Sequence, residues 1–486
     1  MFDLRPVGYV LGLLLLALGL SMLVPMAADL IAQNGHWTAF GQAMLITSLF
    51  GLFTVLACAS SRRQGLNLQE TFLMTTGVWL VLPVFAALPF VFGQTQASYV
   101  DGLFEAMSGM TTTGSTVFSG LDDMALGINL WRGLMQWYGG IGIIVVAMVF
   151  LPELRVGGMQ IFRSEGFDTM GKILPRAAEI ASRISVIYIA LTVLCGISYA
   201  ALGMPTFDAV MHAMTTISTG GFSNHDDSFG IYKGPLEYVG ALFMILASLP
   251  FVRFVQLIAG TARPILRDSQ IRAYLALIFS VTVLFAIYRA VLSGVGLEMG
   301  FREGLFNVTS IMSGTGYASS DYQSWGGAAV AAFFFIGLIG GCAGSTSCSI
   351  KVFRYQLLFA SISTQVRRLY APHGVFEPRY QGRPVAEDVM NAVMAFFVLF
   401  FVSLSVIAIL LGLTGLDFTT AMSGAATALA NVGPGLGPVI GPVVGDGMGF
   451  GALNEAAKWI LIAAMLIGRL ELVVVFVLFT ARFWRG

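Results

Sequence analysis

Four short segments of small and hydroxyl-bearing residues recur along the chain, and each precedes a long apolar run. None contains a nucleophile beside an obvious base, so their side chains offer little catalytic chemistry. Their backbones offer more, because glycine reaches angles closed to other residues and rings of carbonyl oxygens can replace the hydration shell of a cation. The segments are "LFEAMSGMTTTGST" (103–116), "AVMHAMTTISTGGF" (209–222), "LFNVTSIMSGTGYA" (305–318) and "MSGAATALANVGPG" (422–435).

The four segments can be aligned on one glycine each. The first and third copies also share Leu-Phe at the same distance before that glycine. A single Thr-x-Gly would be explained as a turn, whereas four copies in one context indicate a repeated backbone. The alignment predicts four matched sets, which are Thr112, Thr113 and Gly114; Ser218, Thr219 and Gly220; Gly314, Thr315 and Gly316; and Asn431, Val432 and Gly433.

The elements that would position these segments are membrane-spanning helices. Charged residues make up 11% of the chain and hydrophobic residues 57%, with a mean hydropathy of +0.82, whereas a soluble protein carries about 25% charged residues. Many apolar runs reach the roughly 20 residues that a helix needs to cross a bilayer. We therefore predict an all-α polytopic membrane protein embedded in the lipid bilayer.

The apolar runs are organised as repeats. Two leading helices, near 7–31 and 39–58, are followed by four units of span, short polar-tipped segment and span. Each unit has two full spans, so all four segments dip in from one side and can converge on one axis. The sequence predicts pseudo-fourfold symmetry around one ion pore, with boundaries at 1–68, 69–172, 173–268, 269–384 and 385–486. The spans lie near 70–92 and 130–152, 180–202 and 235–262, 272–296 and 327–357, and 388–413 and 452–481.

The charge pattern sets the expected orientation and excludes some partners. The formal net charge is zero, so no nucleic-acid partner is indicated, and most of the 26 Lys and Arg residues fall in alternate connections or tails. By the positive-inside rule these connections and both termini are cytoplasmic. Acidic residues such as Asp122 and Asp208 lie on the opposite side, where they would concentrate cations. The four cysteines and four histidines show no metal or redox spacing.

The motifs "STGGFS", "SGTGY" and "ANVGPGLGP" resemble those of the Trk/Ktr/HKT superfamily of potassium transporters, in its TrkH-type membrane subunit. The resemblance covers nearly the whole chain. It implies potassium uptake across the bacterial inner membrane, with the four aligned sets as the selectivity filter. It further implies a homodimer, a cytosolic TrkA-type nucleotide-binding regulatory subunit, K⁺ as the transported ion and no bound organic cofactor.

The stretch 337–350 interrupts the second span of the third repeat with glycines. Each interior glycine costs a helix roughly 1 kcal/mol relative to alanine, so the stretch is either a kinked, closely packed helix or a loop below the pore segments. The resemblance implies the second, an intramembrane loop that blocks the pore until it moves. Ser347, Cys348 and Ser349 stand where more glycine would be expected. The candidate gate residues are Gly340, Gly341, Gly344, Ser345, Thr346 and Ser347.

Arg469 is a charge near the middle of the last span, where insertion costs about 2.5–3.5 kcal/mol. Glu471 lies two residues on and would not share its helix face, so Arg469 either pairs with another helix or faces a cavity. The resemblance implies a cationic barrier in the pore, and we add Arg469 to the gate.

Glu105 and Asn307 occupy equivalent positions in the aligned first and third segments, and we expect them to anchor those segments. His212, in the second segment, is expected only to pack.

Two other classes of function remain as alternatives. A membrane enzyme would need paired acids, a Ser/His set or a metal cluster inside the spans, and none stands out, so we predict that the chain is not an enzyme. A Na⁺/K⁺ or H⁺/K⁺ coupled symporter of the same fold stays open, although no carboxylate stands out at mid-membrane. The basic connections 153–179 and 351–386 are either a docking surface for the cytosolic subunit or a consequence of topology alone.

Overall fold

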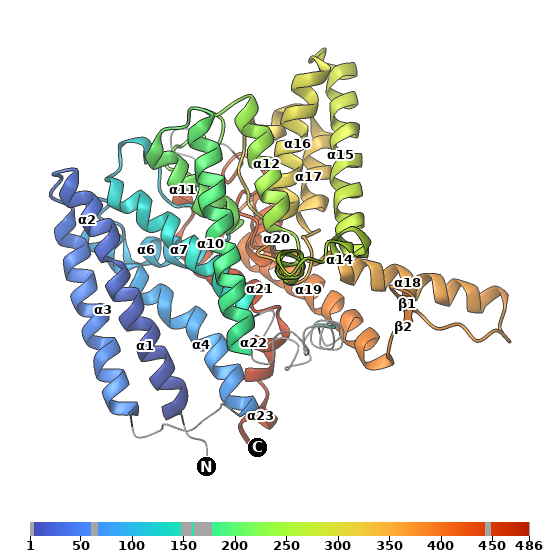
Figure 1. Ribbon diagram of the computed structural model, residues 1–486, viewed down its shortest axis with the longest axis horizontal. Helices are drawn as coiled ribbons and strands as arrows, with labels where there is room; N and C mark the ends of the chain where they lie inside the picture. Colours follow the sequence, from blue (N-terminus) through green and yellow to red (C-terminus); the bar gives the residue numbers. More distant parts are fainter. Residues whose placement is uncertain (1–3, 60–66, 147–157, 160–176, 443–448, 486) are drawn as a thin grey trace.

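The computed structural model describes residues 4–59, 67–146, 158–159, 177–442 and 449–485 of the chain, and this part is built almost entirely of helices (Figure 1). Within these ranges the strands are β1 (Arg379–Tyr380) and β2 (Arg383–Pro384), an antiparallel pair with Tyr380 opposite Arg383. The predicted all-α architecture is confirmed.

Two leading helices lie side by side at one end of the molecule. The first is formed by α1 (Arg5–Ser21) and α2 (Leu23–Ile31), and the second is α3 (Trp37–Cys58). Their backbones approach closely, because a Cβ on Gly12 would lie 3.0 Å from the Gly51 carbonyl oxygen. Small residues allow such contact between helices in a membrane. Buried Asp29 ties the pair to the first repeat by accepting the Gly127 amide at 2.7 Å.

Four units of similar design follow the leading helices, and each contains a short helix that ends inside the molecule. Side chains cap several starts: Asn67 and Glu70 form a capping box on α4, and Ser98 accepts the Asp101 amide, which satisfies amides that a helix start leaves unpaired. The first two units contain α4 (Leu68–Ala86), α5 (Leu88–Phe92), α6 (Tyr99–Met110), η1 (Leu121–Asp123) and α7 (Leu126–Val145), then α10 (Ala177–Ala201), α11 (Thr206–Ile217), α12 (Pro235–Ala247) and α13 (Phe251–Ile258).

The third and fourth units repeat the plan with longer connections. We call α6, α11, α16 and α20, one from each unit, the pore helices. The elements of these units are α14 (Arg263–Arg267), α15 (Ser269–Ser293), α16 (Leu297–Ser313), η3 (Tyr322–Trp325), α17 (Gly327–Gly337) and α18 (Val352–Tyr370), then α19 (Glu387–Leu413), α20 (Phe418–Ala430), η4 (Phe450–Ala452), α21 (Glu455–Arg469), α22 (Val473–Leu478) and α23 (Ala481–Arg485).

Three of the second spans are broken, and the sequence predicted only one of these breaks. The interruption after Gly337 is present, since α18 does not begin until Val352. The predicted span 235–262 is broken, because α12 and α13 meet at 90° beside Pro250, a residue that disfavours helix before it. The span 452–481 is also broken, since α21 ends at Arg469.

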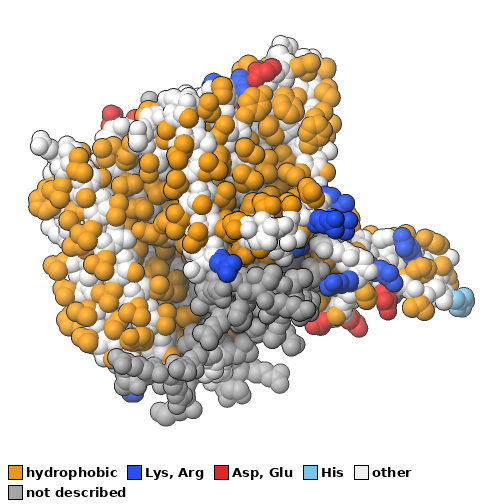
Figure 2. All heavy atoms as spheres, in the orientation of Figure 1, with side chains coloured by type: hydrophobic (Ala, Val, Ile, Leu, Met, Phe, Trp, Pro, Cys, Tyr) orange, Lys and Arg blue, Asp and Glu red, His pale blue; other side chains and the backbone are white. Residues whose placement is uncertain are grey.

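The outer face of the helices suits a lipid environment. Figure 2 shows hydrophobic side chains over most of the face in view, with charged side chains gathered toward its two ends. Six helices in the described ranges are long and apolar enough to cross a membrane, and the bent pair α12 and α13 makes a seventh if it counts as one span. The six are Arg5–Ile31, Trp37–Cys58, Gln69–Phe92, Ala181–Ala201, Ser269–Ser293 and Glu387–Leu413.

Candidate functional site

The four pore helices end in the same unusual backbone. A left-handed residue follows each helix, and a second one comes two positions later. A positive φ is uncommon outside glycine, so its recurrence at three non-glycine residues marks a repeated structure. The φ angles are 52° and 89° at Thr112 and Gly114, 51° and 76° at Thr219 and Gly221, 82° and 84° at Gly314 and Gly316, and 52° and 93° at Asn431 and Gly433.

This geometry corrects the predicted set in the second repeat by one residue. The predicted set of Ser218, Thr219 and Gly220 is wrong in register; the matching residues are Thr219, Gly220 and Gly221. Ser218 instead caps α11. The sequence contains two adjacent glycines, and the alignment used the first, whereas the left-handed angle falls on the second.

Hydrogen bonds at the ends of the pore helices support the new register. The Thr113 amide donates to the Ser108 carbonyl at 2.8 Å, and the Gly220 amide donates to the Thr215 carbonyl at 2.9 Å. In the fourth repeat the Val432 amide donates to the Thr427 carbonyl at 3.1 Å. Gly220 therefore corresponds to Thr113 and Val432, and not to Gly114.

The four loops adjoin one another in a closed cycle. At each second left-handed glycine, an added Cβ would press on the carbonyl oxygen of the residue before the corresponding glycine in the next loop. Only glycine fits such close backbone approach. The contacts run from Gly114 to Gly220, from Gly221 to Thr315, from Gly316 to Val432 and from Gly433 back to Thr113. This cycle is the geometry expected of pseudo-fourfold symmetry.

An open cavity lies beside this cycle. All four second glycines line it, namely Gly114, Gly221, Gly316 and Gly433. The loops therefore end at one shared vestibule. Elsewhere in the described ranges, as here, no group of three or more His, Cys, Asp or Glu side chains could hold a metal ion.

One polar residue in each of three pore helices ties the helix to the chain beyond its loop. Glu105 accepts the Val117 amide at 3.0 Å, and Asn307 accepts the Ser319 amide at 3.1 Å. His212 lies at the same position in the second pore helix, with its Nε2 atom 3.1 Å from the Ser223 hydroxyl. The role of His212 is therefore more than packing. The sequence could have indicated this role, because His212 aligns with Glu105 and Asn307 once the register of the second segment is corrected.

Arg132 joins the first loop to the second. Its Nε atom donates to Glu105 at 2.7 Å and its Nη1 atom to the Ser223 carbonyl at 2.6 Å, and both side chains of the ion pair are fully buried. The guanidinium also lies over the Phe222 ring, 4.3 Å from its centroid. This pair holds two neighbouring loops in one arrangement.

Replacing Glu105 with glutamine is expected to lower the stability of the protein strongly. Removing one partner of a buried ion pair leaves the other charge uncompensated and costs about 3–5 kcal/mol. Thermal unfolding in detergent measures the change. Glu298→Gln is the matched control, because Glu298 pairs with Arg302 but is 68% exposed, and its loss should move the melting temperature little. Equal shifts for both variants would contradict this role for Glu105.

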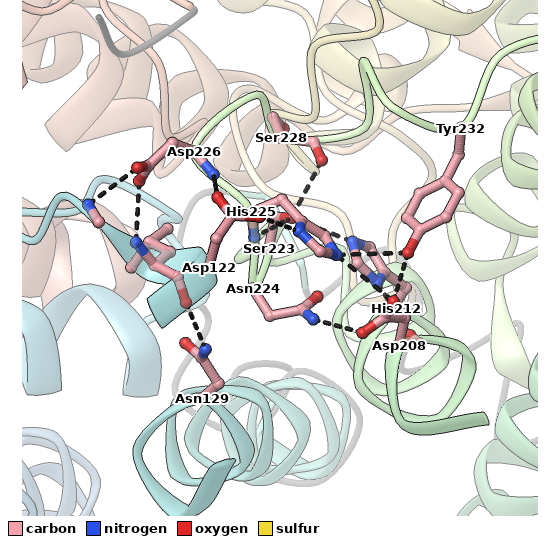
Figure 3. Close-up of polar contacts among 12 residues, drawn as sticks. Asp122, Asn129, Asp208, His212, Ser223, Asn224, His225, Asp226, Ser228 and Tyr232 are labelled. Atoms are coloured by element: carbon pink, nitrogen blue, oxygen red, sulfur yellow. Dashed lines mark hydrogen bonds and ion pairs between the residues drawn. The ribbon is translucent and has the colours of Figure 1, made fainter. Parts of the chain in front are cut away.

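A second polar cluster joins the loops farther out in the vestibule (Figure 3). His225 contacts Asp122 of the first repeat and Asp208 of the second, the latter at 3.4 Å. Asp226 accepts the Gly120 and Leu121 amides at 2.8 and 3.1 Å. The chain beyond the second loop is thus fastened to the chain beyond the first.

Acid is expected to loosen this cluster through Asp122. Partial burial raises the pKa of Asp122, but hydrogen bonds from His225 and the Asp226 amide outweigh it and hold that pKa below its ordinary value of 3.8. Stability from such a carboxylate is present above the ordinary value and is lost as the pH falls through the lowered one. Below about pH 4 the wild type should lose more thermal stability than Asp122→Asn. Parallel losses in both proteins would contradict this expectation.

A loop between α17 and α18, residues 338–351, lies directly below the cycle. The break in the second repeat holds one side of it: the Cys342 amide donates to the Ser248 carbonyl at 3.0 Å, and the Phe251 amide donates to Gly344 at 2.9 Å. On the other side the Ser349 amide donates to the Ala430 carbonyl, at the end of the fourth pore helix, at 2.9 Å.

The predicted gate residues all lie in this loop or against it. The Gly340 amide donates to Ile350 at 2.8 Å, and the Gly341 amide donates to the Ser347 hydroxyl at 2.7 Å. Thr346 donates through its hydroxyl to Ala247 at 2.9 Å. Ser345 folds back onto the Cys342 carbonyl at 2.6 Å. The stretch is a closely hydrogen-bonded loop and not a kinked helix.

Cys348 and Arg469 meet at the base of the cycle. The Cys348 sulfur lies 3.0 Å from Arg469 Nη1 and 3.6 Å from the Thr112 hydroxyl. Arg469 Nη2 donates to the Gly139 carbonyl at 2.9 Å, and its guanidinium lies 5.1 Å from the Trp79 ring centroid. Arg469 is 3% exposed. The sequence analysis did not include Cys348 among the candidate site residues. The feature that could have pointed to it is that Cys348 stands where glycine was expected.

Arg469 carries its buried charge without a carboxylate partner in the described part of the chain. The nearby Glu471 forms its ion pair with Arg354 of α18 instead. The alternative of a salt bridge from Arg469 to another helix is therefore not realised among the described residues. The Arg469 guanidinium therefore contacts the loop at the base of the cycle through Cys348, without a carboxylate between them.

Comparisons with known proteins agree with this architecture. A family described as TrkH, cation transport protein, matches residues 36–293 and 290–485. The chain is 42% identical to the Trk system potassium uptake protein TrkI of Halomonas elongata, over 99% of this chain and 97% of that protein. It is 34% identical to the Trk system potassium uptake protein TrkH of Escherichia coli K12, over 99% of both. The crystal structure of the potassium transporter TrkH from Vibrio parahaemolyticus matches with a TM-score of 0.90 and 31% identity, covering both chains fully.

Proposed function

The chain belongs to the TrkH family of cation transport proteins, and from that premise we propose that it carries potassium into a bacterial cell through one pore formed by its four loops. It is a membrane transporter and not an enzyme. The observation that carries the proposal is the closed cycle of contacts among the loops, because one cycle defines one path.

The filter in this proposal consists of Thr112–Gly114, Thr219–Gly221, Gly314–Gly316 and Asn431–Gly433. Its carbonyl oxygens would replace the water around K⁺ as the ion enters. The four pore helices end at these loops, so the partial negative charge of their C-terminal ends favours a cation there. The alternating left-handed angles support this reading, because they turn successive peptide groups differently from those of a helix or strand.

The gate in this proposal is the loop 338–351 together with Arg469. The loop lies across the base of the filter, and Cys348 is in contact with Thr112, the first residue of the first filter segment. Arg469 adds electrostatic repulsion at the same place. An ion can pass only when both move aside, and their shared contact supports a joint movement.

The remaining assignments concern the surroundings of the pore. We place the protein in the inner membrane with both termini in the cytoplasm, as a homodimer that binds a TrkA-type nucleotide-binding subunit. The segment 351–386, with Arg367 and Arg368 on α18, is the proposed docking surface. The other basic connection, 153–179, lies mostly outside the described residues. Support comes from the basic charge of these connections and from relatives named as parts of a Trk system.

Cation flux into liposomes holding the purified protein tests the proposal. K⁺, Rb⁺, Na⁺ and Li⁺ are compared under a set voltage, with and without the cytosolic subunit and nucleotides. Flux that favours K⁺ and Rb⁺ supports a filter. Equal flux of all four ions contradicts selectivity, and flux that needs a Na⁺ or proton gradient supports a coupled symporter instead. No flux even with the subunit contradicts the proposal.

A further inference from the structure

We propose that the Arg354–Glu471 ion pair positions Arg469 beneath the filter and couples its movement to α18. Glu471 and Arg354 are then positioning residues that never touch the ion. The inference rests on the proposed function, because it specifies what holds the proposed gate closed. Three features of the structure carry the inference. They are a strained break in the fourth repeat, a buried ion pair at that break and a short connection from the pair to the gating loop.

The break directly after Arg469 is strained. Glu471 and Leu472 both have left-handed backbones, with φ of 54° and 57°, which crowd the Cβ of any residue other than glycine. Neither residue is of a type that favours this conformation, so the surrounding structure must impose it. Leu472 is buried, and its amide donates to the Ile467 carbonyl at 3.0 Å. Arg469 lies in the last turn before this break, so its direction depends on the break.

The ion pair holds the break from outside its own helix. Arg354 binds Glu471 with a side chain that is 1% exposed, and its guanidinium lies 3.8 Å from the centroid of the Phe396 ring. A pair this deeply buried gains little net stability over apolar packing. What it does provide is a fixed position for Glu471, and through the break a fixed position for Arg469.

The same pair connects the break to the gating loop. Arg354 lies in the first turn of α18, where its amide donates to the Lys351 carbonyl at 3.0 Å, and the Val352 amide donates back to Gly341 at 3.1 Å. The loop and the start of α18 therefore form one unit. Figure 1 shows α18 extending away from the body of the molecule. A displacement of α18 would pull on Glu471 and on Cys348 together.

Two side-chain contacts thus join the gating loop and the start of α18 to the break in the fourth repeat, besides the hydrogen bond from the Ser349 amide to Ala430. Cys348 contacts Arg469 itself, at 3.0 Å, and Arg354 contacts the residue that fixes the break below it. When both separate, the strain at Glu471 and Leu472 can relax toward helix, which would rotate Arg469 away from its present place. The gate in this account has two arrangements, and α18 selects between them.

Replacing Glu471 with glutamine tests the coupling. Without the ion pair the strained break should relax, and K⁺ flux through liposomes without the cytosolic subunit should rise by about tenfold, in proportion to the strain released. The ratio of K⁺ to Na⁺ flux should stay unchanged, because the filter is untouched. Glu303→Gln is the matched control: Glu303 forms a buried ion pair with Arg289 at 2.7 Å, with its side chain 2% exposed against 11% for Glu471. It lies near the start of α16, whereas the gating loop lies below the end of that helix, so this variant should not raise flux per folded molecule.

Reversing both charges of the pair distinguishes the loss of the ion pair from a general loss of folding. Arg354→Glu combined with Glu471→Arg restores a pair of opposite charges and should return flux toward the wild-type value. Glu471→Asp should give an intermediate flux, because it keeps the charge on a shorter side chain. A purely structural role predicts instead that both variants lose folded protein without any gain in flux per molecule.

Thiol labelling gives a readout that does not depend on ion flux. Cys348 is 6% exposed and Cys342 is fully buried in the same loop, so mass spectrometry can follow each after treatment with a methanethiosulfonate reagent. Glu471→Gln should label Cys348 faster and leave Cys342 unchanged. Faster labelling with no K⁺ flux in any protein would overturn the proposed function and leave the coupling standing. Wild-type K⁺ flux with unchanged flux and labelling in Glu471→Gln would overturn the coupling alone.

Discussion

Replacing Gly316 with serine is expected to lower the preference for K⁺ over Na⁺ by about tenfold or more. Gly316 has φ of 84°, and an added Cβ would press on the Val432 carbonyl oxygen and lie 2.7 Å from Pro434 Cδ. A side chain held in such a backbone costs about 1–3 kcal/mol, and each 1.4 kcal/mol is about tenfold in an equilibrium. The protein would relieve this strain by moving the Val432 carbonyl group away from the carbonyl groups of the neighbouring loops. Relative K⁺ and Na⁺ flux in liposomes measures the change.

Gly327→Ser is the control for this substitution. Gly327 lies in the same repeat, at the start of α17, and an added Cβ there would meet no atom within 4 Å. It should leave the flux ratio at the wild-type value. An unchanged ratio in Gly316→Ser would contradict the assignment of these glycines to a filter, provided that the variant carries K⁺ at all.

Replacing Arg469 with alanine is expected to raise K⁺ flux by about 30-fold. Two unit charges about 8 Å apart repel by about 2 kcal/mol at an effective dielectric constant of about 20, and that repulsion corresponds to about a 30-fold change in rate. The substitution also removes the contact with Cys348 and so loosens the loop. Single-channel or liposome flux without the cytosolic subunit measures the effect.

Arg469→Lys separates the two causes. Lysine keeps the positive charge, but its single nitrogen cannot make both the Cys348 and the Gly139 contacts that the guanidinium makes. Repulsion alone predicts wild-type flux for lysine, whereas the lost contacts predict a value between those of arginine and alanine. Flux that falls or stays level in Arg469→Ala would contradict a barrier at this position.

The pore architecture could be predicted from sequence because its signal is repeated. Four glycine-containing segments, each before a long apolar run, indicated the number of repeats and the shared direction of the loops. The register of the second loop could not be predicted in this way. Gly220 and Gly221 are adjacent, and the structure is needed to distinguish the glycine that has φ of 76° from its neighbour.

The broken helices show where local sequence stops being informative. The bend between α12 and α13 had a visible cause in Pro250, although one proline does not fix an angle of 90°. The break after Arg469 has no local cause, since Glu471 and Leu472 are ordinary helix residues. The residue that pairs with Glu471 at this break, Arg354, is remote in sequence and belongs to another repeat. Burial of Arg469 without a carboxylate among the described residues likewise depends on packing that no local pattern encodes.

Locating a bound ion shows whether the four loops form the filter. A crystal of the protein grown with Rb⁺ in place of K⁺ would be measured at the rubidium absorption edge, and the anomalous density would be mapped. We expect a peak on the axis of the four loops, among the carbonyl groups of Thr113, Gly220, Thr315 and Val432, which the closed cycle of contacts brings together. Anomalous density elsewhere in the chain, with none at this ring, would contradict the assignment of the four loops as the filter.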